Sequence, residues 1–357
     1  MATSLSAMGH HVVVLSLINP LWRRPSTVEL RGNLRVITSH FLDGIVLREM
    51  LLAGIVQFEY PYLLPMMIFL KMLGRHVVLD EHGIESVFLI ELKKIPKMTK
   101  EPRSIGFLMK RIPWIEYGAF AIEKLAIRIA DAVFVCSNDD ALEIRRLYEV
   151  DKRKVVVVPN AVDSRFFDRV EPYEFGRPTV LFLGSFDHPP NLEGALTLTR
   201  EIMPCVWSEV ENALCVFIGK NPPNWKTARD DALLFIGRVE DIRPLIAGAN
   251  VVVAPIFSGS GTRQKIVEYM ALGKPIVSTT KGAQGLELTD GTHFMRRDTI
   301  KSFSEAVVEL MRNREQAGLL GNRVRKVAEE EYSWDSQITV VVQAYRRTMR
   351  RDSLRRQ

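Results

Sequence analysis

The chain has 357 residues, of which 47% are hydrophobic and 25% charged, and its formal net charge is +6. This length exceeds one ordinary core, so two domains are expected, and the composition is that of a globular protein. The three cysteines lie apart, with no Cys-x-x-Cys and no histidine at metal-binding spacing, which predicts small buried thiols in a reducing compartment and no metal site.

Neither a membrane span nor a signal peptide is apparent. No apolar run reaches the roughly 18 residues of a span, and the opening MATSLSAMGHHVVVLSL lacks the parts of a signal peptide. Positive charge gathers in residues 91–114 and in the tail, 344–357. Such basic segments are either solvated faces or contacts with an anionic membrane surface, and no aromatic-basic motif indicates nucleic acid. The expected location is the cytoplasm, with the inner face of the membrane as a peripheral alternative.

Short β-branched runs recur along the chain, separated by helical stretches. In the first half these runs are HVVVLSL, LRVITS, GIVQFEY, HVVLDEH, DAVFVCS and KVVVVPN. After residue 172 the pattern restarts with PTVLFLGS, ALCVFIGK, ALLFIGR, NVVVAPIF, KPIVST and HFMRR. Continuous apolar strands that alternate with helices predict parallel sheets covered on both faces. The fold class is therefore α/β, with two Rossmann-like, doubly wound domains.

The boundary between the two series lies in NAVDSRFFDRVEPYEFGRP, near residues 165–178, where Pro, Gly and charge replace helical periodicity. Ligands of open parallel sheets bind beyond the carboxyl ends of the strands. The loops that follow strands are accordingly the places to look for chemistry: EHGIES in the first half, and GSFDHPPN, GKNPP, GRVEDI and SGSGTRQK in the second.

The segment APIFSGSGTRQKIVEYMALGKPIVS runs from a strand through Gly259 and Gly261 into a helix. Glycines let a ligand approach the backbone, and a helix N-terminus attracts anions. Arg263 and Lys265 add cations suited to phosphate oxygens. Gly261, Lys265 and Glu268 have the spacing of one helix face, with Glu268 roughly 10 Å from Gly261. This face suits a nucleoside diphosphate from phosphates to ribose; the alternative is an ordinary amphipathic helix with a surface Lys–Glu pair.

The longer segment VVVAPIFSGSGTRQKIVEYMALGKPIVSTTKGAQGLEL resembles the donor site of group 1 glycosyltransferases, the retaining family 4 enzymes with the GT-B fold. Other segments fall in the family's order: VVLDEHGIES, ADAVFVCSNDDALEIRRL, VVVVPNAVD, VLFLGSFDHPPNLEGALTLTREIMP and FIGRVEDIRPLIAGANVVVAPI. The late YSWDSQITVVVQAYRRTM is similar to the closing helix, which returns to the N-terminal domain. The resemblance implies an acceptor-side domain at 1–170, a nucleotide-sugar donor domain at 171–334, and a crossover helix with a basic tail at 335–357.

By this resemblance, Glu268 corresponds to the second acid of the family's two-glutamate motif and holds the ribose hydroxyls. Gly259, Gly261 and Thr262 belong to the same donor loop. The first acid, eight residues before Glu268, is replaced by Ser260, which leaves the role of that acid open.

A second departure lies in GSFDHPPN, where many members carry Gly-Arg and a downstream Lys-Gly that hold the diphosphate. Here Gly184 is followed by Ser185, and Asn191 stands near them without a cation. We interpret Arg263 and Lys265 as the substitutes.

The resemblance also assigns residues outside the Gly loop. His82, in DEHGIES, corresponds to the histidine that the family places against the donor sugar and the reaction centre; a capping or core histidine is the alternative. GRVEDI resembles the segment beside the base, where Gly237, Arg238 and Val239 offer backbone groups.

Acceptor-side residues are less clearly marked. Glu59, Tyr60 and Tyr62 follow a strand of the first domain, and we expect them to contact the acceptor. Asp80, Glu81 and Glu85 are further candidates for acceptor binding, although acids near strand ends are more often caps and surface charges.

Together these residues predict transfer of a hexosyl-type sugar from a nucleoside-diphosphate sugar to a glycan or lipid-linked acceptor, with retention of configuration. Arg263, Lys265 and backbone N–H groups are expected to stabilise the departing diphosphate, and His82 to orient the sugar. The resemblance implies no cofactor and no obligatory metal. The sequence agrees, because no Asp-x-Asp stands beside a strand end and NDD, residues 138–140, begins a helix as its cap. The sequence does not name the sugar, the base or the acceptor.

Three other functions were weighed. A nicotinamide-dependent oxidoreductase needs Gly-x-Gly-x-x-Gly after its first strand, and the chain has no such motif. A nucleotide-sugar epimerase shares the fold and is distinguished by an acceptor-free assay. A non-catalytic or impaired relative that binds nucleotide is favoured by Ser260 and by the opening of the chain.

That opening predicts an incomplete N-terminal sheet. Residues 2–8 resemble the end of the helix that, in the family, follows a first strand and a Gly-containing loop. In the order 3-2-1-4-5 this first strand is central. The strands at 12–17 and 55–59 are therefore expected to pair with each other or to leave a gap, which exposes unpaired backbone groups. The expectation is a chain that is short at its start or less active than its relatives.

Overall fold

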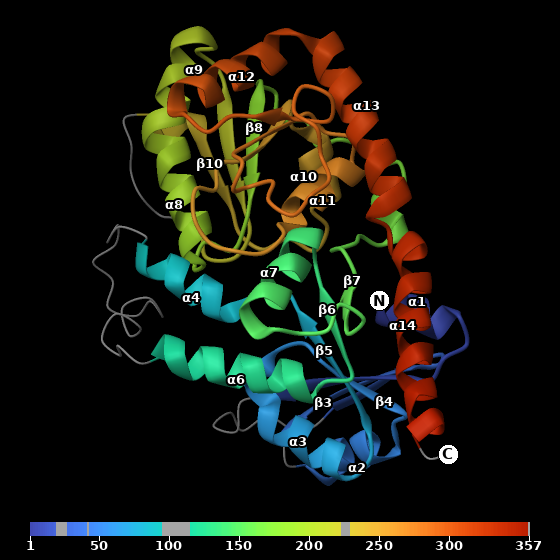
Figure 1. The fold of residues 1–357 in the computed structure, drawn as a ribbon. Coiled ribbons are helices and arrows are strands. Elements are labelled where there is room, and N and C mark those ends of the chain that lie inside the picture. Colours follow the sequence, from blue (N-terminus) through green and yellow to red (C-terminus); the bar gives the residue numbers. More distant parts are fainter. Residues whose placement is uncertain (19–26, 41–42, 95–114, 223–228, 356–357) are drawn as a thin grey trace. The chain divides into compact units, whose positions relative to one another are not determined.

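The computed structural model describes residues 1–18, 27–40, 43–94, 115–222 and 229–355, which form two compact units (Figure 1). The first unit comprises Met1–His82, Phe120–Val158 and Trp334–Gln357, and the second comprises Gly83–Ala119 and Pro159–Ser333. The chain thus first enters the second unit at Gly83, and it returns there at Pro159, slightly before the region where the sequence places the boundary.

The described part of the first unit contains the strands β1 (Val12–Ile18), β2 (Thr27–Arg31), β3 (Leu34–His40), β4 (Ile55–Phe58), β5 (His76–Glu81), β6 (Ala132–Val135) and β7 (Val155–Val157). Its helices are α1 (Ala2–Ala7), α2 (Gly44–Leu52), α3 (Leu64–Met72), most of α6 (Ile115–Ile129), α7 (Asn138–Tyr148) and α14 (Trp334–Arg355). The apolar runs of the first half of the sequence are all found as strands, and β2 is an additional strand.

These strands form two separate sheets. Strands β4, β5, β6 and β7 pair in parallel in that order, whereas β1 pairs in parallel with β3, which pairs antiparallel with β2. Among the described residues, no strand pairs with the remaining edge of β1 or of β4. Strands β1 and β4 therefore do not pair with each other, which is one of the two outcomes expected from the sequence. The described residues contain no strand in the expected central position.

Helix α14 packs on the first unit although it follows the second in sequence. Its apolar side chains Ile338 and Val341 are buried against Val78 and Phe134 of the parallel sheet, and Leu5 of α1 joins the same cluster. This confirms the returning helix that the resemblance implied. The arginines of its last turns that precede residue 351 are exposed.

The second unit contains β8 (Thr179–Leu183), β9 (Leu214–Ile218), β10 (Leu233–Ile236), β11 (Val251–Ala254), β12 (Ile276–Ser278) and β13 (Met295–Arg296). Its helices are α4 (Glu85–Lys94), α8 (Pro189–Thr197), α9 (Met203–Glu209), α10 (Arg243–Gly248), α11 (Gln264–Ala271), α12 (Ile300–Arg312) and α13 (Arg314–Glu331). All six strands predicted for the second half are present.

These strands make one parallel sheet in the order β10-β9-β8-β11-β12-β13. Its central strands are buried on both faces, as their continuous apolar runs require. The chain order reverses between β8 and β11, and in such sheets the reversal leaves a ligand-binding crevice beyond the carboxyl ends of the strands.

Tyr269 fixes helix α11 at this reversal. The side chain is fully buried, and its hydroxyl oxygen accepts a hydrogen bond of 2.7 Å from the backbone N–H of Leu183, at the end of β8. Burial also raises the pKa of the phenol, so the hydroxyl stays neutral. The bond holds the end of β8 at a set distance from the first turns of α11.

We predict that Tyr269→Phe lowers the free energy of unfolding by about 1–3 kcal/mol, because the Leu183 amide loses its acceptor in a partly buried position. Urea unfolding followed by circular dichroism measures the change. Tyr173→Phe is the matched control, since Tyr173 is 51% exposed and keeps its ring contact with Phe175. Equal losses in the two variants would contradict the prediction.

Candidate functional site

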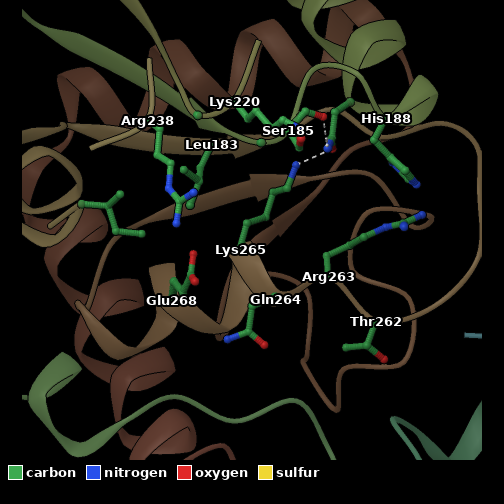
Figure 2. Close-up of a pocket in the computed structure, with 14 residues that line it drawn as sticks. Leu183, Ser185, His188, Lys220, Arg238, Thr262, Arg263, Gln264, Lys265 and Glu268 are labelled. Atoms are coloured by element: carbon green, nitrogen blue, oxygen red, sulfur yellow. Dashed lines mark hydrogen bonds between the residues drawn. The ribbon is translucent and has the colours of Figure 1, made fainter. Parts of the chain in front are cut away.

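A cavity of about 500 Å³ lies at the carboxyl edge of the second unit's sheet (Figure 2). Its walls come from the loops after β8, β9 and β10 and from the start of α11. The lining residues are Leu183, Gly184, Ser185, His188, Asn191, Gly219, Lys220, Arg238, Ile242, Thr262, Arg263, Gln264, Lys265 and Glu268. The cavity therefore occupies the crevice where the strand order reverses.

The structure brings most of the predicted donor-site side chains together in this cavity. Those that line it are Gly184, Ser185, Arg238, Thr262, Arg263, Lys265 and Glu268. Others lie outside its walls: Gly259, Ser260 and Gly261 in the loop before α11, and Gly237 and Val239 on either side of Arg238. His82 belongs to the first unit.

One detail of the predicted Gly loop is wrong. Helix α11 begins at Gln264, with Arg263 as its N-cap, so Gly261 precedes the helix and cannot share its face. Gly259 and Gly261 have φ angles of 91° and 80°, in the left-handed region that glycine tolerates. Because of these turns the helix begins three residues after Gly261, the position from which the sequence analysis counted the helix face. Lys265 and Glu268 do line the same cavity, as expected.

Arg263 is committed to the loop as well as to the cavity. Its guanidinium donates hydrogen bonds of 2.9 Å and 3.1 Å to the backbone carbonyls of Ser260 and Ser258. The side chain therefore holds the Gly loop in place while it adds positive charge to the cavity wall.

Lys265 is 9% exposed. Its Nζ donates a hydrogen bond of 2.6 Å to Oδ1 of Asn191 and lies 4.3 Å from the ring centre of Phe182. A Cβ at Gly184 would lie only 3.2 Å from Nζ, so the glycine makes room for the ammonium. Burial, helped by Arg263, pushes the pKa of Lys265 well below its ordinary value. An anionic ligand would act as the counterion that the buried amine lacks, and would favour its protonated form.

Glu268 shares the wall with Lys265. Burial raises the pKa of its carboxyl group to about 7, and Lys265 opposes the shift. Figure 2 shows the side chains of Arg238 and Glu268 pointing toward one another from different walls. Both the protonated and the ionised forms of Glu268 are therefore populated near neutral pH.

Two further titratable groups were not singled out from the sequence. Nζ of Lys220, after β9, lies 3.0 Å from a carboxylate oxygen of Asp187, so its charge is partly balanced. Burial and the nearby Arg263 lower the pKa of His188 to about 4, which makes this histidine neutral. The remaining lining residues that sequence reasoning missed are Leu183, Gly219, Ile242 and Gln264.

In the first unit, the predicted catalytic and acceptor-side residues gather at the carboxyl ends of β4 and β5. Nε2 of His82 lies 2.7 Å from Oε2 of Glu59, and the ring centres of Tyr60 and His82 are 5.6 Å apart. The exposed rings of Tyr60 and Tyr62 are stacked, with centres 6.2 Å apart. Ligand atoms of Glu59, Asp80 and His82 all lie within 4.8 Å of one another.

Two family models match the chain, over residues 177–313 ("Glycosyl transferases group 1") and residues 1–166 ("Glycosyltransferase Family 4"). The chain belongs to the group 1 glycosyltransferases. It is similar to phosphatidyl-myo-inositol mannosyltransferase of Mycobacterium leprae, with 27% identity over 170 residues, which is 44% of each chain. The chain spans about half the length of the curated relatives it matches.

Solved structures share the fold. Sucrose-phosphate synthase from Thermosynechococcus elongatus superimposes with a TM-score of 0.71 at 16% identity, over 97% of this chain and 91% of the other. HepE of Anabaena in complex with UDP-glucose gives a TM-score of 0.60 at 13% identity, over 84% and 79% of the two chains. The expected α/β fold with two Rossmann-like domains is confirmed.

We predict that the affinity for a free nucleoside, tested with uridine and guanosine, rises up to about tenfold between pH 6 and pH 8. Ribose hydroxyls donate to the ionised carboxylate of Glu268, and the pKa of about 7 means that this form increases over the interval. Ligand-observed NMR measures the affinity. Glu268→Gln should bind more weakly, by about 1.5–3 kcal/mol, without the pH dependence. The same slope in this variant would place the ribose elsewhere.

Proposed function

We propose that the chain transfers a hexosyl-type sugar from a nucleoside-diphosphate sugar to a glycan or lipid-linked acceptor, with retention of configuration. The observation that carries the proposal is the cavity at the strand reversal, where Arg263, Lys265 and Glu268 line the wall. Two cations followed by a carboxylate suit a diphosphate followed by ribose hydroxyls. The mannosyltransferase relative and the HepE structure with UDP-glucose support the same chemistry.

In this mechanism the second unit binds the leaving group. Lys265 and Arg263 stabilise the negative charge that develops on the diphosphate as the glycosidic bond to the sugar breaks. Lys265 takes up a proton as the anion enters, since the phosphate charge opposes the effect of burial on its pKa. His82 of the first unit orients the sugar. No cofactor and no obligatory metal are included in the proposal.

An assay of sugar transfer tests this function directly. The protein is incubated with UDP- and GDP-sugars, with and without glycan and polyprenyl-phosphate acceptors, and products are separated by mass spectrometry. Acceptor-dependent release of the nucleoside diphosphate supports transfer. Conversion of the nucleotide sugar without acceptor would indicate an epimerase, and binding without any product would indicate a non-catalytic relative.

We predict that Lys265→Met and Arg263→Ala weaken UDP or GDP binding by about 1.5–3 kcal/mol each, because each removes a charged partner of the phosphates. Free nucleoside should bind nearly as before. Calorimetry with both ligands gives the comparison. Lys326→Ala, on the exposed surface of α13, is the control, and Ser185→Ala is expected to have little effect. Equal losses for diphosphate and nucleoside would show that the two cations are structural.

We also propose that the protein works at an anionic membrane surface, where a lipid-linked acceptor would lie. Helix α3 has an exposed face made only of Pro65, Ile68, Phe69, Met72 and Leu73, with Met72 80% exposed. The opposite face is buried and apolar too, and a helix that is apolar all round needs a non-aqueous neighbour on its outer side.

Charge and sequence support a bilayer as that neighbour. Residues 91–114 hold seven Lys and Arg against two Glu, whereas the charge of Lys71 in α3 is paired with Asp131 at 2.7 Å. Most of residues 91–114 lie outside the described residues. Among the described helices, none is long and apolar enough to cross a membrane.

We predict that the protein co-floats with vesicles of phosphatidylcholine and phosphatidylglycerol, and that Phe69→Glu and Met72→Glu together reduce binding at least about tenfold. Each large apolar side chain contributes about 1.5–3 kcal/mol when buried. Leu319→Glu, which changes an exposed leucine of α13, is the matched control. If the α3 double variant bound vesicles as well as the unaltered protein does, α3 would not be the membrane-binding face.

A further inference from the structure

His82 and Glu59 meet because β4 and β5 are parallel neighbours. Phe58 pairs with Leu79 at the end of the ladder, so the residues that follow each strand emerge side by side. Oε2 of Glu59 lies 2.7 Å from Nε2 of His82, within the range of a strong charge-assisted hydrogen bond. Glu59 therefore occupies one ring nitrogen and leaves Nδ1 as the ring atom that can face a substrate.

Glu59 is itself held from behind by Gln57. The amide nitrogen of Gln57 donates to Oε1 of Glu59 at 3.2 Å and to Oδ2 of Asp80 at 2.9 Å. The amide oxygen of Gln57 accepts a hydrogen bond of 2.5 Å from the hydroxyl of Tyr345 on α14. A side chain supported at both oxygens is more restricted than an ordinary surface glutamate.

The charges around the ring favour its protonated form. Glu59 from β4 and Asp80 from β5 face His82, and the amino group of Met1 faces both carboxylates. The bond to Glu59 raises the pKa of His82 and lowers that of Glu59, and burial opposes both shifts. Burial, then Glu59, raises the pKa of Asp80 to about 6. The Tyr345 phenol stays neutral because burial raises its pKa.

An ordinary ion pair is the alternative. The side chains of His82 and Glu59 are 43% and 56% exposed, and pairs as exposed as this contribute little to stability. Two contacts distinguish this pair: Gln57 bridges the carboxylates of Glu59 and Asp80, and the ring centre of Tyr60 lies 5.6 Å from that of His82.

We propose that Glu59 is the positioning residue for His82: it fixes the orientation of the ring and keeps it protonated, so that Nδ1–H is presented as a donor to the sugar. This rests on the proposed sugar transfer, because that function gives His82 its role. As a donor, the ring would bind a sugar hydroxyl or the negative charge developing on the leaving group. His82 would lose this capacity as pH rises through its pKa.

The first test follows His82 itself by NMR titration of its ring in the full chain and in Glu59→Gln, which keeps the size of the side chain but removes the charge. The pKa of His82 should fall in the variant. Glu143→Gln, which breaks an exposed ion pair on α7, should leave it unchanged. An unchanged titration in Glu59→Gln overturns the proposal. This readout needs no turnover, so it also decides the matter if sugar transfer is not found.

The second test uses turnover. Glu59→Gln should lower kcat roughly tenfold with little change in donor KM, and should move the alkaline limb of the pH profile to lower pH. Glu59→Asp should restore part of the loss. In a His82→Ala background, Glu59→Gln should have no further effect, because Glu59 acts through the ring. Additive losses would assign Glu59 an independent role and overturn the proposal.

The third outcome concerns a cation. Because ligand atoms of Glu59, Asp80 and His82 lie within 4.8 Å of one another, Mg²⁺ and Zn²⁺ are titrated alone into the protein and observed at the His82 ring. If the His82 ring does not respond to either cation, the result supports the hydrogen-bonded pair of His82 and Glu59. Stoichiometric binding that deprotonates the ring and is lost in Glu59→Gln would identify a metal site and overturn the positioning role.

Discussion

The buried amine of Lys265 is the constraint on which the arrangement of the donor cavity depends. A charge taken out of water is costly unless it is paired, and the Lys265 amine contacts the Asn191 amide and the face of Phe182, while the charge of Glu268 also favours its protonated form. A Cβ at Gly184 would lie 3.0 Å from Cγ of Asn191 and 3.2 Å from Nζ of Lys265, and a Cβ at Gly219 would lie 2.0 Å from the Gly184 carbonyl oxygen. Gly184, after β8, is thus explained by the Lys265 and Asn191 side chains beside it. Gly219, after β9, is explained by the close approach of the Gly184 backbone.

The sequence predicts those parts of the site that depend on local order. Apolar runs located the strands, and the spacing from Lys265 to Glu268 placed both side chains on one wall because they share a helix. The start of α11 was misplaced because the positive φ angles of Gly259 and Gly261 are not encoded in a helical spacing. Lys220 was missed because its proximity to Asp187 follows from the pairing of β8 with β9, which no local motif reveals.

In the first unit, the residues that meet are even further apart in the sequence than Lys220 and Asp187. Gln57 and Tyr345 are separated by 288 positions, yet their hydrogen bond supports Glu59. A closing helix could be expected from resemblance, but which of its side chains reaches β4 depends on how α14 is rotated on the sheet. Glu59 was therefore expected to contact the acceptor, whereas its oxygens are engaged by His82 and Gln57. Glu59 could be identified from the sequence as a candidate site residue, but its hydrogen-bond partners could be identified only from the fold.

Lys265 and Glu268 also exchange protons in opposite directions when a ligand enters. Phosphate charge favours the protonated amine of Lys265, so diphosphate binding takes up a proton there above the lowered pKa. Ribose hydroxyls favour the ionised carboxylate of Glu268, so the same ligand releases a proton near pH 7. A nucleoside makes only the second exchange, and its affinity rises with pH. A diphosphate makes both, and because the two linkages oppose one another, its affinity should vary less with pH than that of the nucleoside.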